Sequence, residues 1–193
     1  MSANALRRLT RRVETLQRWL TRAYRLDVHV DAARYLIAAE QARALLPLRA
    51  PRSGVLALEE AGTLWLGLYL DPRDRGRLAA LVEETSHLVC LAWHAELGRR
   101  VSRLHLELQA EVDQYLVGRL WGRDGLAHFR SFRWARGMDA PTRWRYENAH
   151  RVGHRYCRSL SRRYPKRADT PGLLRELRDF YRAPGEQKLS AGA

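Results

Sequence analysis

One segment, from Leu78 to Leu97, constrains the fold more than any other because its apolar residues fall on nearly every side of a predicted helix. At about 3.6 residues per turn these residues cannot share a single stripe. They are Leu78, Leu81, Val82, Leu88, Val89, Leu91 and Trp93. A helix that is apolar all round is covered by its neighbours on several sides. We therefore expect this helix at the centre of the fold.

The same helix carries ionisable side chains on one face. Glu83, His87 and His94 lie four and then seven residues apart, with Glu84 one step round the helix and Cys90 between the histidines. This spacing stacks them above one another. Carboxylates and imidazoles are costly to bury unless they are paired, hydrogen-bonded or bound to a metal. The pattern favours a metal site; the alternative is a solvated stripe on an otherwise structural helix.

The N-terminal half alternates helical and extended patterns. An amphipathic helix is predicted over about Ala5 to Tyr24, and a second helix from Asp31 to about Leu45. Leu26 to Val30 alternates apolar and polar residues, which is typical of a short strand. Val55 to Leu58 and Thr63 to Leu70 flank a loop with a glycine and predict a hairpin. We expect a small antiparallel sheet of about three strands, packed on helices.

The C-terminal half has helical patterns almost throughout. Helices are predicted from Ser102 to about Trp121, from Thr142 to Arg163 and from Thr170 to about Tyr181, and the segment after Trp121 is rich in turn residues. A chain of 193 residues is long enough to bury one sizeable core. The expected fold class is therefore α+β, with a single domain over residues 1–185 and a flexible tail over residues 186–193.

Cysteine usage and hydropathy indicate a cytoplasmic protein. Cys90 and Cys157 lie inside predicted helices, and no C-x-x-C motif occurs, which is usual in a reducing compartment. The N-terminal residues are charged from Arg7 onward and lack the apolar core of a secretory signal. No stretch approaches about 18 uncharged apolar residues, so no membrane span is expected.

The run E-E-T-S-H at residues 83–87 resembles the active-site helix of the gluzincin metallopeptidases. In that family H-E-x-x-H is followed about twenty residues later by a glutamate ligand on the next helix. The order of predicted elements over roughly residues 25 to 120 is also similar to the family's core. The resemblance implies that Glu83, His87 and Glu107 hold a metal ion and that Glu84 activates a water molecule.

This sequence departs from the family's motif at its first histidine, which is Glu83 here. A site with two carboxylates and one imidazole suits manganese or iron as well as zinc, because added negative charge favours harder metals. The resemblance therefore implies a divergent zincin-like metal-binding protein, either a metal-dependent hydrolase or an inactive relative. Glu111 falls near the buried side of the same helix as Glu107, which makes it a further candidate ligand.

A second combination of ligands uses two E-x-x-H helices. Glu84 with His87, and Glu147 with His150, together with Glu111, match the ligand set of ferritin-like di-iron carboxylate proteins. That fold needs four long helices, whereas the N-terminal half here has strand patterns.

A hybrid arrangement is a mononuclear site that is completed by His150 or His154. In the gluzincin-like arrangement the same two histidines would support the transition state. His94 is an additional candidate ligand in the central helix, and Glu147 flanks His150.

A function from another class is suggested by the basic charge. The chain has 35 Lys+Arg against 21 Asp+Glu and a formal net charge of +14, which attracts nucleic acid or acidic proteins. The segment from Phe129 to Arg167 interleaves arginines with aromatic residues, a combination that suits phosphates and unstacked bases. The candidate contacts on its predicted helix are Arg143, Arg151, Arg155, Arg158 and Arg162. In this alternative the central helix is scaffold.

Overall fold

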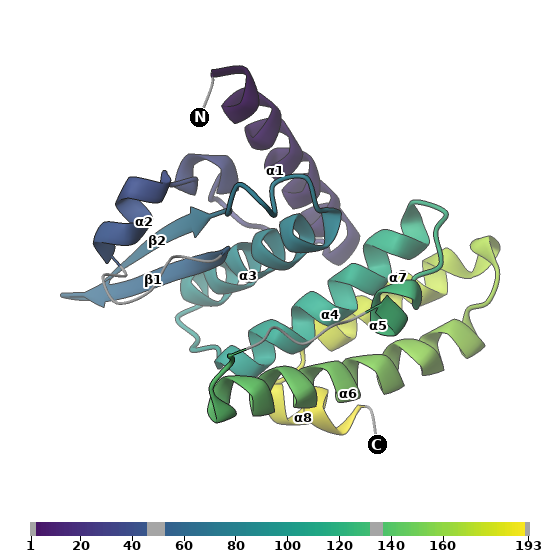
Figure 1. Cartoon of the computed structure of the whole chain (residues 1–193). Coiled ribbons are helices and arrows are strands. Elements are labelled where there is room, and N and C mark those ends of the chain that lie inside the picture. Colours follow the sequence, from purple (N-terminus) through teal and green to yellow (C-terminus); the bar gives the residue numbers. More distant parts are fainter. Residues whose placement is uncertain (1–2, 46–52, 132–136, 192–193) are drawn as a thin grey trace. The chain divides into compact units, whose positions relative to one another are not determined.

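The structure is a computed structural model, and it describes residues 3–45, 53–131 and 137–191. The chain divides into two compact units (Figure 1). Unit 1 comprises Met1–Thr21 and Leu26–Arg99, and unit 2 comprises Arg22–Arg25 and Arg100–Ala193. Unit 1 contains a small antiparallel sheet with helices, and unit 2 is helical, so the α+β fold class is confirmed.

Helix α1 (Ala3–Tyr24) begins the chain and confirms the predicted amphipathic helix. Leu9, Val13, Leu16 and Leu20 recur at spacings of three and four residues, and all four are buried. The last turn, from Arg22, belongs to unit 2. Arg11 and Arg18 are exposed, whereas Arg12 is half-buried and donates to the Arg75 carbonyl at 2.5 Å.

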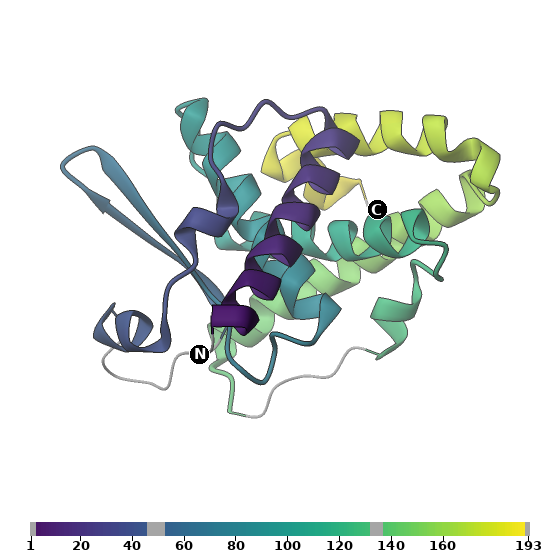
Figure 2. The same cartoon turned by 90° about the horizontal axis from the view of Figure 1, so that it is seen from above.

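A β-hairpin follows in unit 1, as predicted. Strands β1 (Gly54–Glu60) and β2 (Thr63–Tyr69) pair antiparallel with Leu58 opposite Trp65. The two turn residues, Ala61 and Gly62, both have positive φ angles, as the twist of a two-residue hairpin requires. Figure 2 shows the tip of the hairpin extending away from α3, in agreement with the exposed Leu58 and Trp65.

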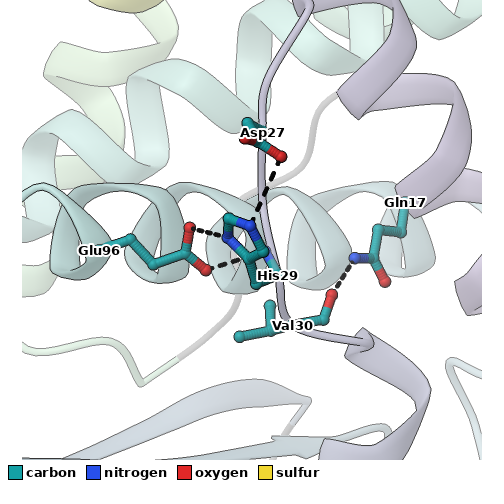
Figure 3. A network of polar contacts seen from close by, with 5 residues as sticks. All are labelled: Gln17, Asp27, His29, Val30 and Glu96. Atoms are coloured by element: carbon teal, nitrogen blue, oxygen red, sulfur yellow. Dashed lines mark hydrogen bonds and ion pairs between the residues drawn. The ribbon is translucent and has the colours of Figure 1, made fainter.

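The strand predicted over Leu26 to Val30 does not form, so the described residues contain two strands rather than three. Side chains take the backbone groups that a neighbouring strand would use (Figure 3). The amide of His29 donates to Glu96 Oε1 at 3.0 Å, and the carbonyl of Val30 accepts from Gln17 Nε2 at 2.5 Å. An alternating pattern predicts an extended conformation but does not supply the partner strand.

The helix predicted from Asp31 is interrupted. A 3-10 turn, η1 (Ala32–Tyr35), is followed after three residues by α2 (Ala39–Leu45). Between them Leu36 forms an isolated parallel bridge with Leu68 of β2, and the Ile37 amide donates to the Leu68 carbonyl at 3.0 Å. The contacts of Leu36 and Ile37 with β2 therefore take the place of one helical turn between η1 and α2.

Helix α3 (Leu78–Glu96) is the central helix of unit 1, as its apolar pattern predicts. It packs against both strands of the hairpin. Leu81, Val82, Leu88 and Val89 are all buried although they point to different sides of the helix. No helix in the described part of the chain is long and apolar enough to cross a membrane.

Unit 2 is built on the pair α4 (Arg103–Leu120) and α6 (Ala140–Arg163), which pack along each other (Figure 1). The predicted cap Ser102 accepts from the His105 amide at 3.2 Å, and Asp139 caps α6 by accepting from the Thr142 amide at 2.8 Å. The turn-rich segment before α6 also contains a short helix, α5 (Ala127–Ser131).

The C-terminal part of unit 2 is more ordered than the sequence suggests. After the turn η2 (Arg167–Asp169), α7 (Thr170–Arg182) confirms the predicted last long helix. The expected flexible tail instead includes helix α8 (Gly185–Ser190). Its Lys188 is 0% exposed, and Nζ lies 3.1 Å from Gln109 Oε1 and 2.5 Å from His105 Nε2.

Candidate metal centre

Three helices of unit 2 bring a carboxylate and two imidazoles together. Glu111 lies on α4, His128 on α5 and His150 on α6, and one ligand atom from each lies within 4.8 Å of the other two. His128 Nε2 is 2.6 Å from Glu111 Oε2, and His150 Nδ1 is 3.1 Å from Glu111 Oε1. The two imidazoles therefore approach different oxygens of the same carboxylate.

Two glycines allow the helices to approach at this point. A Cβ atom on Gly153 of α6 would lie 2.9 Å from the Cβ of Glu111, so only glycine allows this spacing of α4 and α6. A Cβ on Gly125 would lie 2.8 Å from the Tyr115 carbonyl oxygen of α4. Gly125 thus holds the loop before α5 against α4, and this loop positions His128.

Phe129 forms the apolar wall beside the histidines. Its ring stacks on His154 with centroids 5.0 Å apart, and it is tilted against His150 at 5.3 Å. Phe129 is itself buried. Because packed aromatic rings restrict one another's rotamers, Phe129 fixes the orientation of the His150 imidazole.

Glu111 is held in its ionised form. The residue is only 6% exposed, and burial alone would raise the pKa of its carboxyl group. Hydrogen bonds from His128 and His150 outweigh that burial and lower the pKa of Glu111 below its usual value. An ionised carboxylate beside two imidazoles is a suitable set of metal ligands.

The spacing is close to that of a metal site. An ion about 2.1 Å from each ligand atom requires those atoms to lie within about 4.2 Å of one another. The His128–Oε2 and His150–Oε1 distances of Glu111 lie within this limit, and one ligand atom from each of the three residues lies within 4.8 Å of the other two. The side chains of His128 and His150 are 20% and 18% exposed, so solvent reaches the site.

The residues of the gluzincin-like set are divided between the two units. Glu83, Glu84 and His87 belong to α3 in unit 1, whereas Glu107 belongs to α4 in unit 2. Glu84 and His87 are buried, with Glu84 Oε2 3.5 Å from His87 Nδ1. A shared site of Glu83, His87 and Glu107 therefore remains a prediction.

Other candidate ligands have local partners. The Nε of Arg145 donates to Glu107 Oε1 at 3.2 Å, and the Nε of Arg143 donates to Glu147 Oε1 at 2.7 Å. His94 Nδ1 lies 2.8 Å from the Cys90 carbonyl oxygen one turn earlier in α3. An ion at any of these residues would have to compete with the partner shown.

The di-iron arrangement also draws on both units, because Glu84 and His87 lie in unit 1. Of its members in unit 2, the structure brings Glu111 and His150 together, while Glu147 pairs with Arg143. Desolvation, with further contributions from His150 and Arg158, lowers the pKa of His154, which favours its neutral form.

His128 was absent from the predicted ligands. It lies in a segment whose glycines predict turns, and the sequence there shows no helical spacing that would mark a histidine as a ligand. The available signal was Asp124 followed by Gly125: the Asp124 side chain accepts from the Leu126 amide at 2.8 Å and forms a turn just before α5.

The five arginines proposed as nucleic-acid contacts all lie on α6 and are exposed. Part of the surrounding basic segment, including Phe132 and Trp134, lies outside the described residues. Comparisons with protein-family models, with curated proteins and with solved structures found no match to this chain. The function is therefore inferred from the chemistry of these sites.

Proposed function

We propose that unit 2 binds one divalent metal ion through Glu111, His128 and His150. The observation that carries this proposal is the meeting of one ligand atom from each of three helices within 4.8 Å. All three helices belong to the same compact unit.

Zinc suits this ligand set best. Two imidazoles and one carboxylate occur in catalytic zinc sites, where a water molecule takes the fourth position. Ferrous iron is the second choice, because two histidines and one carboxylate also form the facial site of iron oxygenases. Manganese ranks below both, since it prefers oxygen ligands. A single carboxylate among the three ligands is the basis of this order.

Hydrolysis is the reaction class that we assign to the site. A zinc ion held by these three ligands would supply a water molecule of lowered pKa, which is the chemistry of metal-dependent hydrolases. Glu111 would neutralise part of the ion's charge, and Phe129 shields one side of the site. The partial exposure of both histidines gives water and substrate access.

The competing explanation is purely structural: Glu111 is buried and the two histidines satisfy it with hydrogen bonds. The two explanations differ in whether adding metal releases protons from the imidazoles. Metal binding requires neutral imidazole nitrogens that face the ion, so it displaces the protons that make these hydrogen bonds. Zinc affinity that falls steadily as the pH is lowered supports the metal centre.

The decisive experiment is zinc titration of chelator-treated protein by calorimetry, together with metal analysis of the protein as purified. We expect one zinc per chain, and its loss in Glu111→Gln and in His150→Ala. His154→Ala is the matched control, because it removes the same side chain one turn further along α6 and should retain the metal. Native protein without stoichiometric zinc or iron binding, or His150→Ala that binds normally, would refute the proposal.

The gluzincin-like prediction gives a different outcome in the same experiment. If Glu83, His87 and Glu107 hold the ion, His87→Ala loses it and His150→Ala does not. Metal-dependent cleavage of an activated ester then tests the hydrolase assignment: activity should disappear with chelator and return with zinc. A protein that binds zinc but cleaves no ester in either state limits the site to metal binding.

A further inference from the structure

Four arginines form one line along the solvent-facing side of α6. Arg151, Arg155, Arg158 and Arg162 follow each other at steps of four, three and four residues, the spacing that keeps side chains on one face of a helix. All four are exposed. Their spacing along the helix axis is about 4.5 to 6 Å. We call these four residues the arginine stripe.

No ion pair neutralises the arginine stripe in the part of the chain that the structure describes. Other arginines of α6 differ in this respect, since Arg143 pairs with Glu147 and Arg163 pairs with Glu176. The stripe therefore presents four uncompensated charges on a single rigid element, which is the arrangement that attracts a linear polyanion.

An exposed tryptophan continues the same line. Trp144 is 60% exposed and lies one turn before Asn148, which in turn lies one turn before Arg151. Asn148 links Trp144 to Arg151. Its Nδ2 donates to the Trp144 carbonyl at 2.8 Å, and its Oδ1 accepts from the Arg151 guanidinium at 2.6 Å. An indole ring at the end of a row of guanidinium groups offers a flat apolar surface beside the charges.

We propose that this face of α6 binds single-stranded nucleic acid, with the arginine stripe on successive phosphates and Trp144 stacked on an unpaired base. A flexible single strand adapts its phosphate spacing to that of the arginines. Its bases are free to stack on an aromatic ring, whereas duplex bases are already stacked. This function is separate from metal binding, and either site can exist without the other.

An anionic membrane surface fits this face less well. Helices that bind membranes carry apolar residues opposite their basic face, and these residues insert among the lipids. The apolar residues of α6, including Val152, Tyr156 and Leu160, are buried within unit 2. Of the described residues on this face, Trp144 alone remains for insertion.

The test measures binding of a fluorescent oligo-dT of about twelve nucleotides by anisotropy as salt is varied. Four phosphate contacts predict that log K falls with log salt concentration at a slope of about −3, at about 0.7 per contact. Replacing Arg155 and Arg158 together with glutamine should reduce the slope by about 1.4. Trp144→Ala should weaken binding about tenfold with little change in slope, because it removes stacking but no charge.

Arg163→Gln is the matched control. Arg163 is exposed on the same helix, but its charge is paired with Glu176 and it lies off the stripe, so binding should be nearly unchanged. The proposal is overturned if Arg163→Gln weakens binding as much as the stripe variants do. It is also overturned if the native protein fails to bind oligo-dT, or binds phosphatidylserine vesicles, polyglutamate or a DNA duplex more tightly. Unchanged circular dichroism of the variants confirms that they fold.

Discussion

The His29–Glu96 pair of unit 1 and the Glu111 cluster of unit 2 both place histidine beside glutamate, and they differ in burial and in the number of elements that hold them. In unit 1, His29 lies at the surface beside Glu96, and 77% of its side chain is exposed (Figure 3). In unit 2, Glu111 is buried and receives His128 and His150 from two other helices. The first is a pair on the surface, whereas the second is a cluster in the interior.

The difference shows why residue types alone do not define a site. Around His29 water screens the charges, and the side chains can turn away at little cost. Around Glu111 the partners have little freedom, because glycines and Phe129 fix the positions from which they approach. A metal ion binds best where the surrounding structure already holds the ligand side chains in position.

The substitution with the largest expected effect on stability is Gly153→Leu. The new side chain would collide with Glu111 on α4 and force the two helices of unit 2 apart, so we expect a loss of about 3 kcal/mol in the free energy of unfolding. Urea denaturation measures it. Gly76→Ala in unit 1 is the control, since a Cβ at Gly76 meets nothing within 4 Å. Equal stability of the two variants would contradict the close approach.

Zinc should stabilise the cluster and leave the surface pair unaffected. At a hundredfold excess over its dissociation constant, a ligand that binds only the folded state contributes about 2.7 kcal/mol. We expect thermal denaturation to show this gain in native protein and in His29→Ala, but not in His128→Ala. If zinc also stabilises His128→Ala, zinc binds at another site.

Tyr24→Phe tests a second buried polar network of unit 2. The Tyr24 hydroxyl donates to the buried Asp113 carboxylate, and Gln109 Nε2 also donates to Asp113 at 3.0 Å. Losing a hydrogen bond to a buried charged group costs about 2 kcal/mol. Thermal denaturation should show this, while Tyr35→Phe, at a half-buried tyrosine of unit 1, should be neutral. A neutral Tyr24→Phe would mean that Asp113 finds another donor.

The smallest expected effect is at the surface pair. A hydrogen bond to Glu96, with contributions from Asp27 and the Glu96 charge, raises the pKa of His29 above its ordinary value of 6.5. Because the pKa is raised in the folded protein, the stabilising contribution is complete below pH 6.5 and disappears as the pH rises through the folded value. An NMR titration should show the pKa of His29 falling in Glu96→Gln. An unchanged titration curve would show that the pair does not persist in solution.

Much of the fold follows from local patterns in the sequence. The apolar positions of α1 and α3, the cap Ser102 and the hairpin loop predicted elements that the structure contains. The prediction of a strand at Leu26 to Val30 was wrong. Backbone groups of this segment bind the side chains of Gln17 and Glu96, which are distant in sequence. Periodicity does not encode such contacts.

The candidate site was only partly predictable. Glu111 and His150 were recognised because a glutamate near a buried helical face and an E-x-x-H spacing are local signals. Their contact with each other, and with His128, depends on how α4, α5 and α6 pack, and Gly153 determines that packing. A glycine inside a helix indicates a close approach, but the sequence does not name the partner.

Lys188 gives a practical reason to keep the last helix when the protein is produced. Its ammonium group lies 5.2 Å from the ring centroids of both Phe180 and Tyr181, in addition to its contact with Gln109. A shortened version that stops at Pro184 would uncover these two rings and open a polar cavity beside Gln109. Such a version should aggregate more readily than the full chain, so an affinity tag is better placed beyond Ser190 than in exchange for α8.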